Sequence, residues 1–456
     1  MLLPRSIEVY YKNESLFMNN PFLYTFLSRL KQSDIQYAIM RGWEEIPDTM
    51  GGGDLDMCVA PAQYQRTKRI LSETLAETDG YVVSFLDSLM APRYCFLALD
   101  WGLQLDICPT TIQYRCANFM PEDFVWKNTI DYKGYKVLSP EADIYLAFMK
   151  EMLNNGFSHK EVYITNLRRR LKTATESEIY TNLSVYSDAT IQLLKEHVLD
   201  ENRQQYSELV RALRKDIHIA GNIRYIRNQL MKIRRLFCHP GYVIAVLGTD
   251  GSGKSTIIDA ITPWLDQAFH KGVSYKHFRP GLLPDLGVVF HKRSANAPKV
   301  EVVDNPHSGK PSGFIGSLMR LSYYIMDYMF GYFKLIWPKI AMHTKVFIFD
   351  RYYYDYYIDQ RRSLMNLPKW IIRLGEIFVP KPDIVLCLGG DPEKIYARKP
   401  ETSLEEVSRQ TDELKRFAAR RKNAVWIDTT QPIENSICDA KTAILKMMST
   451  RFKDVL

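Results

Sequence analysis

The sequence predicts an α/β protein of more than one globular unit, in which the C-terminal half is a parallel sheet wrapped by helices. At 456 residues the chain is too long for one hydrophobic core, because single cores rarely exceed about 250–300 residues. The hydrophobic pattern also changes twice, from mixed strands and helices to helix alone, and then to short apolar runs that alternate with long helical segments. We therefore divide the chain into an α+β domain at 1–139, a helical region at 140–239 that completes the N-terminal half and links the two halves, and a parallel-sheet domain at 240–456.

The bulk composition is that of a folded protein. Apolar residues make up 46% and charged residues 25%, which excludes a disordered chain. The net charge of +8 suits anionic ligands such as nucleotides, but it is spread over a large surface and does not indicate DNA binding. The seven cysteines are odd in number and contain no C-x-x-C pair, so neither a disulfide framework nor a zinc site is indicated. We expect a cytoplasmic protein and leave its oligomeric state open.

The sequence shows no segment suited to crossing a membrane. Residues 1–8 lack the long apolar core of a secretory signal. The longest apolar stretch, 314–340, contains Arg320, Asp327 and Lys334, which would be costly to bury in a bilayer. We expect this stretch to be a helix buried in protein. A peripheral contact with a membrane surface, favoured by its many aromatic residues, is the alternative.

The elements of the N-terminal half follow from period and turn signals. Strands are predicted around 35–40, 55–60, 94–99 and 103–108, with a helix over 61–78. A turn-like connection over 100–102 predicts that the last two strands form a hairpin. From 140 to 237 we predict helices without an intervening strand. The basic end of this region is interpreted as a solvated helix face beside a domain boundary rather than an anion-binding patch, and its basic residues are Arg224, Arg227, Lys232, Arg234 and Arg235.

A glycine-rich loop directly follows the first predicted strand of the C-terminal half. The strand at 242–247 leads into the loop and then into a helical segment at 256–269, which is the order that a phosphate-binding loop requires. The loop residues are Gly248, Thr249, Asp250, Gly251, Ser252, Gly253, Lys254 and Ser255, followed by Thr256. Its glycines let backbone N–H groups face phosphates, and the following helix N-terminus favours negative charge. We predict that Lys254 contacts the β- and γ-phosphates of ATP, that Ser255 binds Mg²⁺, and that the chemistry is phosphoryl transfer.

From about residue 242 to the C-terminus the chain resembles the thymidylate kinase family. The resemblance rests on the loop, on Asp350-Arg351-Tyr352 after a strand, on Lys381-Pro382-Asp383 before the next strand, on Arg279-Pro280-Gly281, and on the eleven-residue spacing of Asp327 and Pro338. It implies a P-loop fold with ATP and Mg²⁺ as cofactors. It also implies that Asp350 holds magnesium or orients the acceptor, although an ordinary ion pair with Arg351 is the alternative.

The same resemblance suggests where the acceptor and the lid lie. Arg279 and Arg351 are the acceptor-side candidates, because cations offset the charge that develops during phosphoryl transfer. Arg398 and Arg409 fall in 393–421, which matches the family's mobile lid by position, although a solvated helix face is an equal alternative.

Three departures weaken the case for thymidylate as the acceptor. Tyr328 stands where the family has an arginine, and the run Tyr352-Tyr353-Tyr354-Asp355-Tyr356 lacks the usual serine. The segment 280–312 is also longer than the family's pattern. We therefore expect a small-molecule, nucleotide or glycan acceptor. Tyr328 is a candidate to bind it, with a place in the hydrophobic core as the alternative.

Three aspartates are the informative residues of the N-terminal half. Asp54 and Asp56 share one face of a strand, and Asp106 lies on a later strand, so the three carboxylates could hold two magnesium ions. Over about 20–138 the arrangement resembles the polymerase-β-like nucleotidyltransferase superfamily, with Arg41-Gly42 in place of its glycine motif. The resemblance implies catalytic and metal-binding roles for the aspartates and a nucleotide-binding role for Gly42. The alternative is a strand with an ordinary polar face.

Together these features favour a bifunctional nucleotide-handling enzyme. The predicted catalytic residues are Lys254, Asp350, Arg351, Asp54, Asp56 and Asp106. The fusion is similar to bacterial proteins of surface-polysaccharide loci. A genuine dTMP kinase and a nucleotide-sensing scaffold with an inactive N-terminal domain are the alternatives.

Overall fold

The computed structural model divides into two compact units. The N-terminal unit comprises Met1–Arg234 with Lys453–Leu456, and the C-terminal unit comprises Arg235–Phe452. The structure describes residues 20–48, 53–109, 112–155, 161–199, 206–218, 223–284 and 311–456. Residues 1–8 and most of the long segment 280–312 lie outside these ranges.

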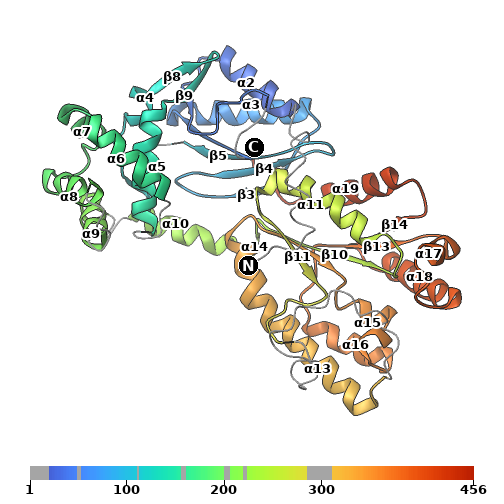
Figure 1. Cartoon of the computed structure of the whole chain (residues 1–456). Helices are drawn as coiled ribbons and strands as arrows, with labels where there is room; N and C mark the ends of the chain where they lie inside the picture. Colours follow the sequence, from blue (N-terminus) through green and yellow to red (C-terminus); the bar gives the residue numbers. More distant parts are fainter. Residues whose placement is uncertain are drawn as a thin grey trace. The chain divides into compact units, whose positions relative to one another are not determined.

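A seven-stranded mixed sheet forms the centre of the N-terminal unit (Figure 1). Its strands, in spatial order, are β3 (Tyr81–Leu86), β4 (Arg93–Leu97), β5 (Gly102–Cys108), β2 (Asp54–Val59), β1 (Tyr37–Ile39), β9 (Tyr135–Leu138) and β8 (Thr129–Tyr132). The expected hairpin is present as β4 and β5, which pair antiparallel, while β2 and β5 pair parallel. The short strands β6 (Gln113–Tyr114) and β7 (Ala117–Asn118) form a separate pair.

Two helices pack together against this sheet. Helix α2 (Pro21–Gln32) begins with Asn20 as N-cap, whose side chain accepts a hydrogen bond from the backbone N–H of Leu23. It buries an apolar face, including Phe22 and Phe26. Helix α3 (Tyr64–Glu77) contacts α2.

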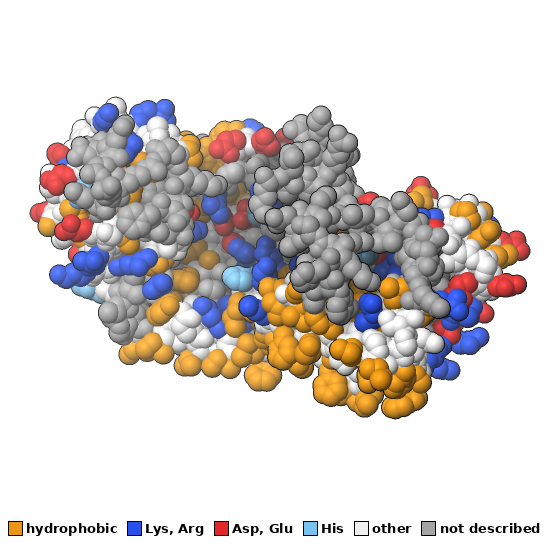
Figure 2. Space-filling model, turned by 60° about the horizontal axis from the view of Figure 1, so that its bottom comes forward, with side chains coloured by type: hydrophobic (Ala, Val, Ile, Leu, Met, Phe, Trp, Pro, Cys, Tyr) orange, Lys and Arg blue, Asp and Glu red, His pale blue; other side chains and the backbone are white. Residues whose placement is uncertain are grey.

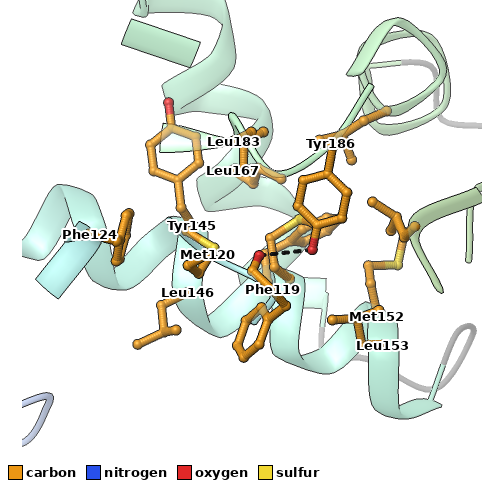
Figure 3. Close-up of a cluster of buried hydrophobic side chains, with 14 of the residues drawn as sticks. Phe119, Met120, Phe124, Tyr145, Leu146, Met152, Leu153, Leu167, Leu183 and Tyr186 are labelled. Carbon is orange, nitrogen blue, oxygen red and sulfur yellow. Dashed lines mark hydrogen bonds between the residues drawn. The ribbon is translucent and has the colours of Figure 1, made fainter. Parts of the chain in front are cut away.

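The remainder of this unit is helical, as the sequence predicts. The helices are α4 (Phe124–Lys127), α5 (Pro140–Asn155), α6 (Glu161–Thr173), α7 (Glu176–Asn182), α8 (Asp188–Leu199), α9 (Tyr206–Asp216) and α10 (Ile223–Arg234). A cluster of buried side chains joins α5, α6 and the loop before α4 (Figure 3). At its centre the Tyr186 hydroxyl donates a hydrogen bond of 2.9 Å to the carbonyl oxygen of Phe119. This bond satisfies a buried polar group inside an apolar core.

The C-terminal unit contains a five-stranded sheet in which all pairs are parallel. In spatial order its strands are β11 (Val273–His277), β12 (Val346–Asp350), β10 (Tyr242–Gly248), β13 (Ile384–Gly389) and β14 (Ala424–Asp428). Four of these strands match the predicted apolar runs, and β11 is an addition. It lies at the edge of the sheet and has mostly polar or half-exposed side chains, so its sequence lacks an apolar run.

Helices connect these parallel strands. They are α11 (Lys254–Phe269), α13 (Phe314–Gly331), α14 (Trp337–Met342), α15 (Asp355–Ile358), α16 (Lys369–Gly375), α17 (Pro392–Arg398), α18 (Leu404–Ala419) and α19 (Ile433–Ser449), with short turns η5 (Tyr332–Ile336), η6 (Arg361–Ser363) and η7 (Glu376–Phe378). Strand β10 is central, with β12 on one side and β13 on the other. In such sheets the loops at the carboxyl ends of the central strands form the ligand site.

The long apolar stretch is not a buried helix, which corrects our expectation. Its first part is α13, and a π-helical turn, η5, joins α13 to α14. Ile315 and Met319 are 74% and 68% exposed, because α13 packs on the rest of the unit through one face alone. Among the helices that the structure describes, none combines the length and the hydropathy needed to cross a bilayer.

Arg451, near the end of the C-terminal unit, contacts the residues that precede strands β10 and β13. Its guanidinium donates to the carbonyl oxygens of His239 (3.2 Å) and Gly241 (3.1 Å), pairs with Asp383, and lies 4.2 Å from the centre of the Tyr242 ring.

We expect Arg451→Met to lower the free energy of unfolding by about 2 kcal/mol, because a partly buried carboxylate loses its partner. Lys446→Met, at an exposed position near the end of α19, is the control. Equal urea midpoints for both variants would contradict this role.

Candidate functional site

The glycine-rich loop connects the central strand β10 to α11. Gly251 and Gly253 have φ angles of +82° and +81°, a left-handed conformation that glycine adopts without strain. At Gly251 there is also no room for a side chain, since a Cβ atom would lie 2.8 Å from the carbonyl oxygen of Ile395. The sequence and the backbone therefore agree on a tight turn that leads into a helix N-terminus.

Lys254 lies inside this turn. Its ammonium group donates to the carbonyl oxygens of Gly248 (3.0 Å) and Thr249 (2.8 Å). Burial, together with the charge of Arg351, lowers the pKa of Lys254 to about 8. A cation held by neutral carbonyl groups in a buried position is well suited to an anionic ligand.

The same loop contains two unsatisfied polar atoms. The hydroxyl oxygens of Thr249 and Ser252 are buried and have no hydrogen-bond partner among the described residues. Ser255 and Thr256, at the start of α11, are exposed. Buried polar groups normally find partners. The loop residues therefore fit a phosphate chain with Mg²⁺ bound at the Ser255 hydroxyl.

Asp350 ends strand β12 beside the loop, paired in register with Val246 of β10. Its Oδ2 accepts a hydrogen bond of 3.1 Å from the Tyr275 hydroxyl and lies 3.4 Å from His277 Nδ1. Its Oδ1 is buried and has no partner among the described residues. Burial alone would raise the pKa of Asp350, but the contacts with His277 and the nearby charge of Lys254 lower it below the usual value. An ionised carboxylate with a free oxygen fits a magnesium ligand.

Arg351 occupies a different place from the one predicted. It is 3% exposed and donates two bonds of 3.0 Å to the carboxylate of Asp355 and one of 2.8 Å to Asp250 in the loop. Its guanidinium is thus held by carboxylates and does not reach outward to an acceptor in this conformation. Among the described residues, its ion pairs are with Asp250 and Asp355 and not with Asp350, the partner that the alternative interpretation gave it, so Arg351 links the loop to α15.

A second arginine, which the sequence analysis missed, also binds Asp250. Arg362 of η6 pairs with the same carboxylate of Asp250. Burial of Asp250 is outweighed by Arg351, Lys254 and Arg362, so its pKa is lowered to about 2. Arg362 lies 112 residues after Asp250 in a short irregular segment, and no sequence signal links the two.

Asp327 organises the acceptor-side segment. This buried carboxylate accepts hydrogen bonds from the backbone N–H groups of Gly281 (3.2 Å), Leu282 (2.8 Å) and Leu283 (2.8 Å). It also accepts one of 3.1 Å from Arg279, whose guanidinium lies 5.0 Å from the centre of the Tyr324 ring. The structure thus brings Arg279 and α13 together through Asp327.

Tyr328 does not line this segment, which corrects its assignment to the acceptor site. Its side chain is fully buried, its hydroxyl donates to the carbonyl oxygen of Phe278, and its ring packs against Tyr352 and Tyr353. The side chain lies on the inner face of α13, where the tyrosine rings of the 352–356 run fill the core. The alternative of a core position is therefore the correct one for Tyr328.

The predicted lid begins with α17 and α18, and the end of α17 lies close to the loop. Arg398 is exposed at the end of α17. The next residue, Lys399, has its Cβ only 3.2 Å from where a side chain on Gly251 would begin, so this segment lies against the loop. Arg409 of α18 pairs with Glu406 and Glu413 and donates a 3.0 Å bond to the carbonyl oxygen of Ile358. Arg409 therefore has a structural contact, and Lys399 is a loop neighbour that the sequence did not reveal.

In the N-terminal unit, the three predicted aspartates lie together. Asp56 of β2 is in direct register with Asp106 of β5, and Asp54 lies two residues earlier on the same face. One carboxylate oxygen of each residue lies within 4.8 Å of the others, and all three residues are half-buried. Hard divalent cations prefer such oxygen ligands. The cluster therefore fits Mg²⁺ or Mn²⁺.

Two arginines offset the charge of this cluster. Arg41 pairs with Asp56, and Arg93 donates two bonds of 2.8 and 2.7 Å to the carboxylate of Asp106. Burial raises the pKa of Asp106 despite its arginine partner. Gly42, with φ of +64°, forms the left-handed turn that follows Arg41.

Arg93 was missed by the sequence analysis, although a signal existed. In the hairpin, Leu97 pairs with Gly102, and counting away from the turn along both strands places Arg93 opposite Asp106. The prediction started this strand one residue too late, and so the arginine was left outside it.

The pKa of Lys254 predicts a pH dependence of nucleotide binding. Below pH 8 the ammonium is charged before ATP binds, whereas above pH 8 binding must be accompanied by proton uptake. We expect the ATP affinity to fall by up to about tenfold per pH unit above 8. Calorimetric titrations from pH 7.5 to 9.5 measure this slope.

The control for this measurement is Lys254→Arg, which keeps its charge over the whole range. It should bind ATP more weakly but without the slope. A pH-independent affinity for the unaltered chain would contradict a lowered pKa of Lys254 that is coupled to nucleotide binding.

The carboxylate cluster predicts a divalent-cation site in the N-terminal unit. Electron paramagnetic resonance of free Mn²⁺ should detect this site without nucleotide. Asp54→Asn/Asp56→Asn should weaken it by at least about tenfold, because two charged ligands are lost. Asp100→Asn, at an exposed position in the β4–β5 turn, should leave it unchanged. Unchanged Mn²⁺ binding in the double variant would exclude the cluster as the site.

Comparison with known proteins provides no assignment. No protein-family model matches this chain, and no curated protein matches it. Interpretation of the two sites therefore depends on their geometry.

Proposed function

We propose that the C-terminal unit is a magnesium-dependent phosphotransferase that moves the γ-phosphoryl group of ATP to a small-molecule or glycan acceptor. The observation that carries this proposal is the pairing of the loop with Asp350. Lys254 lies in a tight turn at the start of a helix, and beside it one oxygen of Asp350 is buried without a partner. A structural loop would not need both features.

Each residue has a distinct task in this proposal. Backbone N–H groups of the loop and the Lys254 ammonium bind the phosphates, while Ser255 and Asp350 hold the metal. Magnesium, when bound, offsets charge on the β- and γ-phosphate oxygens. Arg351 and Arg362 hold Asp250, so they fix the curvature of the loop without touching the nucleotide. They are positioning residues.

The acceptor site is proposed to lie beside the segment held by Asp327. Arg279 is the cation on this side, and Asp327 and the Tyr324 ring restrict its guanidinium. Because Tyr328 replaces the arginine of the resembling family and is buried, a cation that would bind a nucleoside monophosphate is missing at that position. This supports an acceptor other than dTMP.

For the N-terminal unit we propose nucleotidyl transfer, because three carboxylates on two paired strands can hold metal ions that activate a hydroxyl group. Arg41 and Arg93 adjoin the same site and would supply positive charge to a triphosphate. In this proposal both units act on intermediates of one pathway, such as the synthesis of a bacterial surface polysaccharide. A nucleotide-sensing scaffold is the competing function.

Transfer of ³²P from γ-labelled ATP tests the kinase proposal. The acceptors are dTMP, other nucleoside monophosphates, and a panel of sugars and sugar phosphates. We expect a labelled sugar-type product, and we expect Lys254→Ala and Asp350→Asn each to lower kcat by at least about 100-fold. Lys394→Ala and Asp412→Asn, at exposed positions on α17 and α18, are the matched controls.

The outcomes separate the alternatives. Rapid labelling of dTMP would identify a nucleoside monophosphate kinase, and ATP binding without turnover for any acceptor would favour the scaffold. Pyrophosphate release from nucleoside triphosphates, measured in parallel, reports the N-terminal unit. Its persistence in Asp54→Asn/Asp56→Asn would contradict nucleotidyl transfer at the cluster.

A further inference from the structure

A large apolar surface lies on two neighbouring elements of the C-terminal unit. Its side chains come from α13 with η5 and from α16 with η7, and each is between 39% and 74% exposed. We call it the α13–α16 surface, and its members are Phe314, Ile315, Leu318, Met319, Met326, Phe330, Phe333, Trp370, Leu374, Ile377 and Phe378. Isolated exposed apolar residues are ordinary, but a group of this size marks an interaction site.

The two elements are in contact, so the surface is continuous. A Cβ atom on Gly375, the last residue of α16, would lie 2.6 Å from Cδ1 of Ile325 on α13. Along α13, Ile315, Met319, Met326 and Phe330 recur at intervals of four, seven and four residues, which places them on one face. Figure 2 shows hydrophobic side chains gathered in the lower part of the view, on the face that holds this surface.

The exposed charges on these elements are all positive. Lys334, Lys339, Arg373 and Lys381 are exposed at or near the apolar side chains, and Lys369, also exposed, pairs with Glu413 of α18. The two acidic residues of the same elements are already used inside the unit. Asp327 is buried under Arg279, and Glu376 is paired with Arg421 and accepts a hydrogen bond from Tyr357. An apolar centre with a basic border and no exposed carboxylate therefore characterises both elements.

We propose that the α13–α16 surface docks onto an anionic phospholipid membrane. Phenylalanine, tryptophan and aliphatic side chains insert at the boundary between headgroups and acyl chains, and nearby Lys and Arg side chains are attracted to anionic headgroups. A second copy of the chain fits less well. A two-fold interface sets the same patch against itself and would bring the cations together without an exposed acid from these elements to pair with them.

Helix α10 of the N-terminal unit also combines exposed apolar side chains with exposed basic ones. Ile223, Ile226, Leu230 and Ile233 recur every three or four residues and are 53–79% exposed. Asn228, on the other side of the helix, is buried and accepts a hydrogen bond from the Leu89 backbone N–H. The exposed Arg224, Arg227 and Arg234 accompany the apolar stripe. The basic stretch is thus an amphipathic helix rather than a simple solvated face, and it is suited to the same kind of surface.

Cosedimentation of the full chain with vesicles tests the proposal. We expect binding to vesicles of equal parts phosphatidylglycerol and phosphatidylcholine, and little binding to phosphatidylcholine alone. Phe330→Gln/Ile377→Gln should lower the partition coefficient by about tenfold or more. Lys334→Gln/Arg373→Gln/Lys381→Gln should lower it similarly and remove the preference for anionic lipid.

The matched controls substitute exposed residues elsewhere in the unit. They are Leu404→Gln/Ile433→Gln for the apolar variant and Lys394→Gln/Lys422→Gln/Lys446→Gln for the basic one. Both should bind like the unaltered chain. Because all the substituted side chains are exposed, unchanged thermal unfolding of each variant confirms that it folds.

Three results would overturn the proposal. The first is that the unaltered chain does not bind anionic vesicles at low salt. The second is that the surface variants bind as well as their controls. The third is that light scattering shows a dimer that Phe330→Gln/Ile377→Gln dissociates, which would make a second copy the occupant. None of these readouts depends on kinase activity.

Discussion

The candidate site of the C-terminal unit depends on the ion pairs that the Arg351 guanidinium forms. This guanidinium lies at the carboxyl end of β12, where it joins Asp355 at the start of α15 to Asp250 in the loop after β10. A buried cation of this kind is stable only with close anionic partners, so the positions of the loop and of α15 are coupled. Arg362 binds the other oxygen of Asp250 and extends the coupling to η6. The loop is thus shaped by ion pairs before any nucleotide binds.

Helix α13 connects two properties of the molecule. Its inner face carries Asp327, which gathers the backbone of 281–283 and Arg279, and Tyr328, which fills the core. Its outer face carries exposed apolar side chains. The charges that made a membrane span costly are distributed accordingly, since Asp327 is buried in an ion pair and Lys334 is exposed. One helix therefore organises the acceptor-side segment and supplies the proposed docking surface.

The sequence predicted the features that depend on hydrophobic periodicity and on local backbone conformation. The glycine loop and the central strand could be located because strand, turn and helix each have their own signal, and the three aspartates because alternation along a strand fixes their face. Long-range ion pairs could not be predicted. Asp250 and Arg362 meet through an irregular segment, and the tyrosine run could line a pocket or fill a core until the packing of α13 was known. Likewise, β11 depends on its pairing with β12 rather than on its own apolar content.

The two candidate sites differ in how their charges are balanced, and this difference affects ligand binding. In the loop, Lys254 donates its hydrogen bonds to two carbonyl groups and lies 4.0 Å from Asp250, and one oxygen of Asp350 has no described partner, so a metal ion can reach that oxygen without displacing an arginine from it. In the carboxylate cluster, Arg41 and Arg93 already pair with Asp56 and Asp106. A metal ion must displace these arginines, which costs free energy unless they gain new anionic partners. Triphosphate oxygens are such partners, so a bound nucleotide should strengthen the metal binding that the cluster shows without it.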